Sequence, residues 1–296
     1  MHPRNKNRPK LSLSSLLGTS SAQPAQTVPS QLKPARLYDA CFVPSSQQSQ
    51  APKTCSGIPV ESSITPPGES ALIKSVSFPL DEAGKAVVET LRGTKDPVEV
   101  LVAKISQNKA VALEEKDWEA LEVLVDSLAE SCSEGSTERV IVISGILPPP
   151  LITASPSTRL HSSAPYATQY LPRLTELSLV RGLHLKLLPP VLAAEIAAGN
   201  TATASSESIN WWTNEEELKR VLRLYVTPAM ECFGSHRLIY GSSPVPAYAT
   251  QSLLAPERWI ECVWPVVAEL VCAGEKAEAR AEVDMVFYGN AKRILE

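Results

Sequence analysis

The stretch CFGSHRLIYGSSPVP, residues 232–246, joins the end of a helix to a short apolar strand and then to a turn of small residues. An amphipathic pattern over 214–234 predicts the helix, with Asn214 as its N-cap and acidic residues in its first turn. The apolar run over 237–242 predicts the strand. A helix that leads directly into a buried strand indicates an α/β fold.

The same alternation extends toward both ends of the chain. Strands are expected at 36–43, 73–80, 98–105, 110–113, 139–144, 182–187 and 237–242. Helices are expected between them at 81–93, 114–131, 170–180, 191–199 and 214–234, and again near the C-terminus. This order predicts a parallel sheet covered by helices. A (β/α)8 TIM-like barrel is favoured over the alternative, a doubly wound parallel sheet, because no Gly-rich phosphate loop follows the first strand.

Composition divides the 296-residue chain into a tail and one large domain. Residues 1–35 are rich in Ser, Pro and Gln and contain no acidic residue, which predicts a disordered tail. Residues 36–296 are expected to form the barrel domain. Within it, 44–70 has too few apolar residues to pack and is predicted to be a flexible loop, and 200–209 is a Ser- and Thr-rich insert.

Charge and hydropathy limit the partners of the chain. The net charge of -4 offers no electrostatic reason for binding nucleic acid or an anionic membrane. The most apolar long segment starts at Trp259 and contains Glu261, Pro265 and Glu269, so it reads as a buried helix with a proline break and not as a membrane span. Nothing in these patterns indicates an oligomeric state.

The cysteines favour a reducing compartment. Six cysteines are scattered without CxxC pairs, which speaks against a disulfide framework or a zinc ribbon. A cytoplasmic location is therefore expected. The alternative is mitochondrial, because the basic tail loosely resembles a transit peptide, although Pro3 and Pro9 interrupt the helix that such a peptide would need.

In a parallel barrel the chemistry is expected at the carboxyl ends of the strands. The last residues of the expected strands are Cys41, Val43, Phe78, Lys104, Ser144, Lys186, Ser242 and Ser243. Carboxylates and imidazoles are missing from this set, although they are the groups that most often carry acid and base catalysis.

Two C-terminal segments carry a resemblance to a known family. AMECFGSHRLIYGSSPVP (229–246) resembles a segment in which a helix ends in Phe-Gly, an Arg follows, and a strand ends in Gly-Ser-Asp-Trp-Pro. MVFYGNAKRILE (285–296) is similar to a closing helix with the pattern Gly-Asn-Ala-x-Arg. Both belong to the amidohydrolase superfamily, in its amidohydrolase-related, lactonase-like branch of TIM-barrel metal-dependent hydrolases.

The resemblance implies that the first strand has lost its histidines. In the family this strand ends Asp-x-His-x-His, and YDACFV keeps Asp39 but places Cys41 and Val43 at the histidine positions. Valine cannot bind a metal, and catalytic zinc usually takes three protein ligands. Asp39 is expected to hold a loop or a backbone amide.

The resemblance implies further replacements on later strands. Ser144 stands where a further histidine is usual, and Ser243 takes the place of the terminal aspartate, which is the metal ligand or general base of the family. Lys186 is kept from the Val-Lys-Leu-Ser-Gly strand, without its Ser-Gly. We therefore expect no metal and no cofactor, although family members use a divalent metal.

His184 and Lys186 are two residues apart in one strand, so their side chains point to the same face. If that face is the barrel interior, the pair could bind an anionic ligand such as a small carboxylate. The alternative is a structural histidine satisfied in the core. Ser243, Lys186 and His184 are the catalytic candidates, and no Gly-x-Ser-x-Gly elbow surrounds Ser243.

These residues predict a family fold with impaired catalysis. The expected function is that of a pseudoenzyme that binds a small carboxylate or a protein, and the resemblance implies descent from a hydrolase of small cyclic esters or lactones. One alternative is an active, metal-independent lactonase that uses Lys186 and His184. The other is a structural or interaction protein with no ligand.

Overall fold

A computed structural model of the protein describes residues 32–40, 54–62, 73–91, 94–107, 109–130, 138–151, 165–192, 211–272 and 276–295. Most of the expected tail, the insert at 200–209, Cys41 and Val43 lie outside these residues. The disordered tail predicted over 1–35 extends too far, because Leu32 is 6% exposed and packs into the main hydrophobic core.

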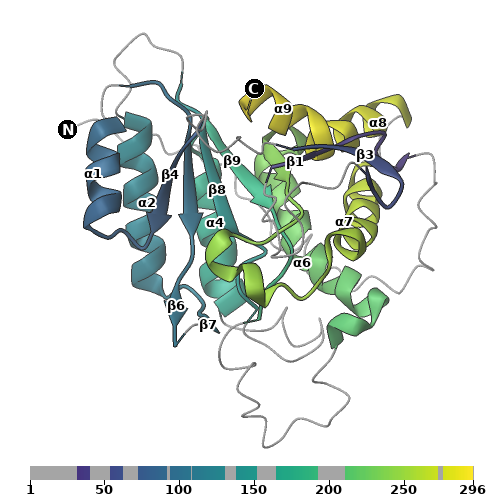
Figure 1. Ribbon diagram of the computed structural model, residues 1–296, viewed down its shortest axis with the longest axis horizontal. Coiled ribbons are helices and arrows are strands. Elements are labelled where there is room, and N and C mark those ends of the chain that lie inside the picture. The colour runs from purple at the N-terminus through teal and green to yellow at the C-terminus, as the bar shows by residue number, and fades with distance from the viewer. Residues whose placement is uncertain are drawn as a thin grey trace, which may run out of the picture.

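Five parallel strands form the main sheet (Figure 1), which confirms the α/β fold with a parallel sheet. They are β4 (Lys74–Phe78), β5 (Val98–Val102), β8 (Ile141–Leu147), β9 (Leu183–Leu187) and β10 (Leu238–Tyr240). Their order in the sheet, β10-β9-β8-β5-β4, is their order along the chain. A doubly wound sheet would reverse direction at a switch point, and this sheet does not.

The first strand lies beside the last, as in the winding of a barrel. In β1 (Leu37–Asp39) the chain reaches Ala40, whose amide donates to the carbonyl of Tyr240 at 3.3 Å. In the part of the chain that the structure describes, the hydrogen-bonded ladder ends at β4 and does not close into a ring of eight strands. A barrel enzyme would carry its site at the carboxyl ends of such parallel strands.

The prediction of a flexible loop over 44–70 is wrong for residues 54–62. These residues form β2 (Thr54–Cys55) and β3 (Ile58–Ser62), and β3 pairs in parallel with β1. Cys55 and Ile58 are both 3% exposed, so two apolar side chains anchor a stretch that is otherwise polar. The low average apolar content of residues 44–70 does not reveal these two side chains.

A small hairpin replaces the end of one expected strand. The strand predicted over 98–105 ends at Val102, and residues 105–110 form the antiparallel pair β6 (Ile105–Ser106) and β7 (Lys109–Ala110). Gln107, at the tip, has a positive φ of 51°. The hairpin projects from the carboxyl end of β5 (Figure 1).

The helices follow the predicted order. They are α1 (Glu82–Leu91), α2 (Glu115–Glu130), α4 (Leu171–Ser178), α6 (Glu215–Phe233), α7 (Pro256–Val271), α8 (Lys276–Asp284) and α9 (Asn290–Leu295). The Asn214 side chain caps α6 by accepting from the Glu217 amide at 3.2 Å. Of the helix expected over 191–199, only Val191 and Leu192 are described, and both form isolated β-bridges. The helix α7 runs through Pro265 without a break.

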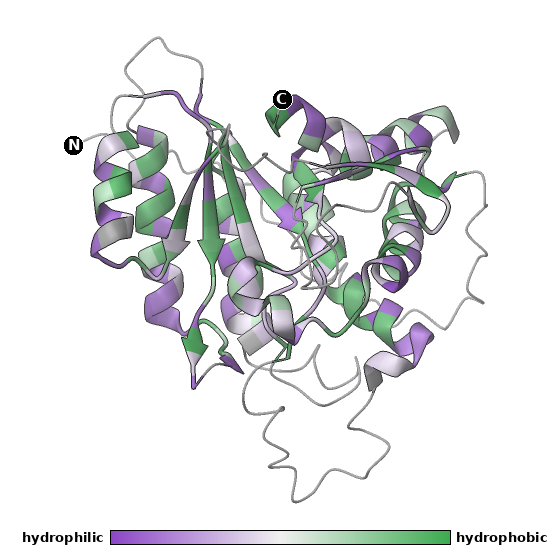
Figure 2. Cartoon of the chain, viewed as in Figure 1, coloured by the Kyte–Doolittle hydropathy of each residue, from purple (hydrophilic) through white to green (hydrophobic). Residues whose placement is uncertain are grey.

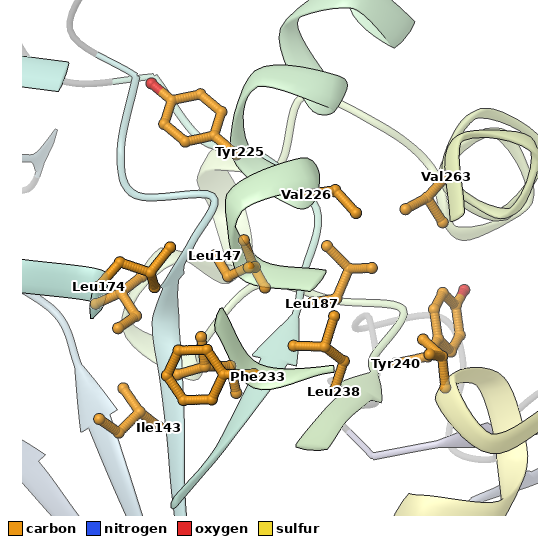
Figure 3. Close-up of a cluster of buried hydrophobic side chains, with 14 of the residues drawn as sticks. Ile143, Leu147, Leu174, Leu187, Tyr225, Val226, Phe233, Leu238, Tyr240 and Val263 are labelled. Carbon is orange, nitrogen blue, oxygen red and sulfur yellow. The ribbon is translucent and has the colours of Figure 1, made fainter. Parts of the chain in front are cut away.

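The main core lies between the sheet and the helices. Figure 3 shows side chains of β8, β9 and β10, such as Ile143 and Leu187, packed with Leu174 of α4, Phe233 of α6 and Val263 of α7. Hydrophobic residues run along the strands, whereas the helices also carry hydrophilic residues (Figure 2). No helix among the described residues is long and apolar enough to cross a membrane.

Two arginines tie pairs of helices together at their C-terminal ends. Arg139, just before β8, donates to the carbonyls of Leu91 at the end of α1 and Leu128 in the last turn of α2. Arg237, just before β10, donates to the carbonyls of Ser178 at the end of α4 and of Phe233 at the end of α6. Each guanidinium therefore satisfies helix-end carbonyls that have no partner within the helix.

The Arg139 clamp can be tested with an exposed arginine as control. Arg139 is 3% exposed, so Arg139→Met removes buried charge-assisted hydrogen bonds to the Leu91 and Leu128 carbonyls, and we expect the free energy of unfolding to fall by about 3 kcal/mol. The Arg181 side chain is 85% exposed, and Arg181→Met should change it by less than about 0.5 kcal/mol. Urea denaturation measures both variants, and equal losses would refute the clamp.

Candidate functional site

Three charged or polar side chains meet on the concave face of the sheet. The Glu99 carboxylate oxygen Oε1 accepts hydrogen bonds from Ser144 Oγ at 2.5 Å and from Lys186 Nζ at 2.7 Å. They come from the adjacent strands β5, β8 and β9. The Lys186 side chain is 3% exposed and that of Glu99 is 13% exposed, so this is an ion pair largely removed from water.

The network continues to the strands β1 and β10. Lys186 Nζ also donates to the carbonyl of Ala40, at 2.7 Å. The next residue back along the chain, Asp39, accepts the amide of Ser242 at 2.8 Å and also the Ser242 hydroxyl. Asp39 therefore anchors the turn after β10, which is the role that the sequence favoured for it.

We call Asp39, Glu99, Ser144, Lys186 and Ser242 the polar belt. All five strands that contribute to it, β1, β5, β8, β9 and β10, run side by side. Ser144 and Lys186 were expected near a common site, and both contact Glu99. Within the belt, the Glu99 carboxylate and the Lys186 ammonium are bonded to each other. Lys186 also donates to a backbone carbonyl, and Asp39 also accepts from a backbone amide.

Glu99 is the residue that reasoning from the sequence missed. Glu99 lies inside β5, whereas the sequence predicts site residues only at the last positions of the strands. The signal was present, because a carboxylate in the apolar run VEVLV must be paired if the strand is buried. A lysine in the equally apolar run LHLKL supplies the opposite charge.

Other expected site residues stand apart from the belt or outside the described chain. Ser243 is half-buried next to Ser242. Cys41 and Val43 lie outside the described residues. His184 is buried nearer the start of β9, where its Nδ1 lies 3.1 Å from the carbonyl of Gly182.

His184 is uncharged near neutral pH. The pKa of His184 is lowered to about 4, chiefly by burial, with smaller lowering effects of Arg293, Arg237 and His236 and a raising effect of the Gly182 carbonyl. A neutral imidazole offers no charge to a carboxylate. His184 and Lys186 thus share a face, but do not form a doubly cationic site.

Apolar side chains cover the belt on the side of the strand ends. A separate cluster of buried residues consists of Ala110, Leu188, Val191, Val245 and Tyr248, with Leu101 and Ala103 packed against it. Leu101 and Leu188 each follow a residue of the ion pair by two positions, so they point to the same face one layer further along. Among the described residues, a buried apolar layer therefore lies next to the belt.

Gly145 makes room for this arrangement. Its φ is +99°, and an added Cβ would lie 2.2 Å from the carbonyl oxygen of Val102. The register between β8 and β9 shifts between Ile143 and Leu147, which is the irregularity that Gly145 permits. Ser144, directly before it, is held in the belt.

The described residues of the belt do not fit a zinc site. Groups of three or more His, Cys, Asp or Glu side chains that could hold a metal ion are absent from the described parts of the chain. Both carboxylate oxygens of Asp39 accept from Ser242, and Glu99 faces an ammonium.

Comparison with known proteins gives only distant likeness. No protein-family model and no curated protein matches the chain. A crystal structure of an amidohydrolase from Burkholderia multivorans with bound zinc is 14% identical, covers 73% of this chain and 57% of its own, and has a TM-score of 0.42. A second structure of an amidohydrolase from that organism, with bound HEPES, is 15% identical with coverages of 73% and 58% and a TM-score of 0.43. The chain thus spans less than two thirds of these structures, and such likeness does not assign it to a family.

The buried ion pair should dominate local stability. Lys186→Met leaves Glu99 as an uncompensated buried carboxylate, and we expect a loss of about 3–5 kcal/mol in the free energy of unfolding. The double variant Glu99→Leu with Lys186→Met should lose less than the sum of its single changes, because neither charge then remains. Urea denaturation of the single and double variants gives this coupling.

An exposed pair on the neighbouring strand serves as control. Lys74 of β4 lies 3.2 Å from Asp96, and the two side chains are 47% and 52% exposed. Lys74→Met should therefore cost less than about 1 kcal/mol. If Lys186→Met costs no more than Lys74→Met, the belt is not a buried ion pair.

His184 should make stability depend on pH. Its pKa is about 4 in the folded chain and has an ordinary value of 6.5, so the unfolded chain takes up a proton first as the pH falls. The contribution is intact above about pH 6.5 and is lost progressively toward pH 4. Between pH 7.5 and 5.5 we expect a loss of about 1 kcal/mol in wild type that is missing in His184→Gln.

Urea midpoints at the two pH values provide the measurement for His184. The control is His236→Gln, because His236 is the more exposed of the two histidines. The pKa of His236 is also lowered, by partial burial of the ring and by Arg237. This control should keep most of the pH dependence of wild type. A His184→Gln variant with an unchanged pH dependence would show that another group is responsible.

Proposed function

We propose that the chain is an amidohydrolase-related barrel protein without hydrolytic activity, that is, a pseudoenzyme that acts by binding a protein. The observation that carries the proposal is the closed set of bonds in the polar belt: Glu99 is bonded to Ser144 and Lys186, and Lys186 to Ala40. The groups that would act on a substrate bind one another.

Contacts between the two family-like segments support the relation to amidohydrolases. Asn290, in the segment 285–296, donates through Nδ2 to the carbonyls of Ser235 at 2.7 Å and Leu238 at 2.9 Å in the segment 229–246. Arg293 donates to the carbonyl of His236 at 3.3 Å. The matching residues therefore form one structural unit that holds the last strand, as a shared fold would require.

The loss of hydrolysis follows from what the reaction needs. Hydrolysis of an ester or lactone requires a water activated by a base or a metal, and a positive group at the developing oxyanion. Asp39 is committed to Ser242 and Glu99 to Lys186, so neither carboxylate is a free base. The Lys186 charge is compensated by Glu99 before any substrate arrives.

Binding of a small carboxylate by His184 and Lys186 is disfavoured on the same grounds. His184 is neutral near pH 7, and the ammonium of Lys186 already has a carboxylate partner. The layer next to the belt is also apolar, and an apolar layer does not favour an anionic ligand. Among the non-hydrolytic functions, we therefore propose binding of a protein.

A metal-independent lactonase that uses Lys186 and His184 remains the competing function. In the structure Lys186 Nζ donates to the Glu99 carboxylate and to the Ala40 carbonyl, so it would have to leave both partners to act on a substrate. We also propose a cytoplasmic location, since the described cysteines Cys55, Cys232, Cys262 and Cys272 are all free thiols.

The full chain can be tested for hydrolysis directly. After loading with zinc or manganese and dialysis, metal analysis should find well under one equivalent per chain. Small lactones and cyclic esters should be turned over no faster than in buffer. Lactone turnover that disappears in Lys186→Ala would establish the competing enzyme, and one retained metal equivalent in wild type would refute the proposal.

A reconstruction variant tests whether the family positions are correctly identified. Cys41→His, Val43→His and Ser243→Asp together restore three side chains of the family pattern. The triple variant should bind zinc in dialysis, whereas a triple alanine variant at the same positions should not. Equal zinc binding by the two variants would mean that these residues do not form the ancestral site.

A further inference from the structure

We propose that residues 244–252, which we call the strap, are a lid over the polar belt that opens locally while the main core stays folded. The strap follows Ser242 and includes a 3-10 helix over Pro246–Gln251. Opening would give solvent and small solutes access to Lys186 and Glu99. The inference goes beyond the proposed function, because it concerns access to the belt whatever the belt does.

The strap forms the layer directly above the ion pair. Val245 and Tyr248 are 1% and 2% exposed and pack with Leu188, next to Leu101. Leu101 and Leu188 are the concave-face residues that follow the ion pair along β5 and β9. A methyl carbon of Val245 would lie 3.3 Å from a Cβ on Gly145, directly after Ser144 of the belt.

The strap is fastened to the β6–β7 hairpin and the segment after β9. Gln251 Oε1 accepts the Ala110 amide at 2.8 Å, and the Tyr248 hydroxyl donates to the carbonyl of Lys104 at 2.9 Å. On the other side, Ser252 forms a bridge with Val191. The hairpin is itself a small peripheral element, and Ile105 on it is 46% exposed.

The packing under the strap is separate from the main core. Its cluster contains five buried residues, Ala110, Leu188, Val191, Val245 and Tyr248, whereas the main core joins the sheet to α2, α4, α6 and α7. Segments that bury few apolar side chains open at lower free energy than the whole domain. The strap therefore has the packing of a locally opening unit.

The charges beneath the strap favour opening further. An ammonium and a carboxylate lose hydration when they are buried, and part of that loss is recovered when water reaches them. Glu99 is already 13% exposed at its side chain, so water needs little further access to reach the pair.

Native-state hydrogen exchange separates local from global opening. The Ala110 amide, bonded to Gln251, should exchange at a rate that does not change in low urea. The Ile141 amide, bonded to the Gly182 carbonyl at 2.9 Å, should exchange only through global unfolding and accelerate with urea. If Ala110 shows the same urea dependence as Ile141, the strap is part of the core and the proposal is wrong.

The accessibility of Lys186 provides a second test. Gln251→Ala removes the acceptor of the Ala110 amide and should raise the rate of Lys186 acetylation by acetic anhydride about tenfold. The control is Val125→Ala in α2, compared after urea brings both variants to equal global stability. Lys85, with its side chain 60% exposed, is the internal reference for reagent. Equal Lys186 rates in the two variants would overturn the lid.

Discussion

A buried ammonium must have an anion beside it, and this constraint organises the concave face of the sheet. Lys186 is 3% exposed at its side chain and reaches both Glu99 and the Ala40 carbonyl. An unpaired charge in this position would cost several kcal/mol. The pair therefore fixes three neighbours at once: β5, which carries Glu99, β9, which carries Lys186, and the end of β1.

The same constraint ties up the functional groups of the belt in bonds with one another. Carboxylates, an ammonium and two hydroxyls lie on one face, which is the usual inventory of a hydrolase site. Each is engaged by a neighbour of the same chain, and on this ground we propose that the groups stabilise the fold and do not act on a substrate. A site of this kind is distinguished from an active one by its bonds and not by its residue types.

Periodicity in the sequence predicted most of the fold. Runs such as RVIVIS and LHLKL showed the buried strands, because parallel strands covered on both faces are continuously apolar. Composition misled at 54–62, where two buried side chains were enough to hold β2 and β3. The site was only half predictable: Lys186 and Ser144 stood at strand ends, but Glu99 could be recognised only with knowledge of which strand lies beside which.

The arginine clamps bear on how the chain folds during synthesis. Arg139 binds carbonyls of α1 and α2, and Arg237 binds carbonyls of α4 and α6, so every partner precedes its arginine in the chain. Each clamp can close as soon as its arginine has been made, and the sheet can grow strand by strand from β4 to β10. Only β1 has to wait, because Asp39 meets Ser242 203 residues later. The slowest step of assembly is thus expected to be the docking of the first strand onto the last.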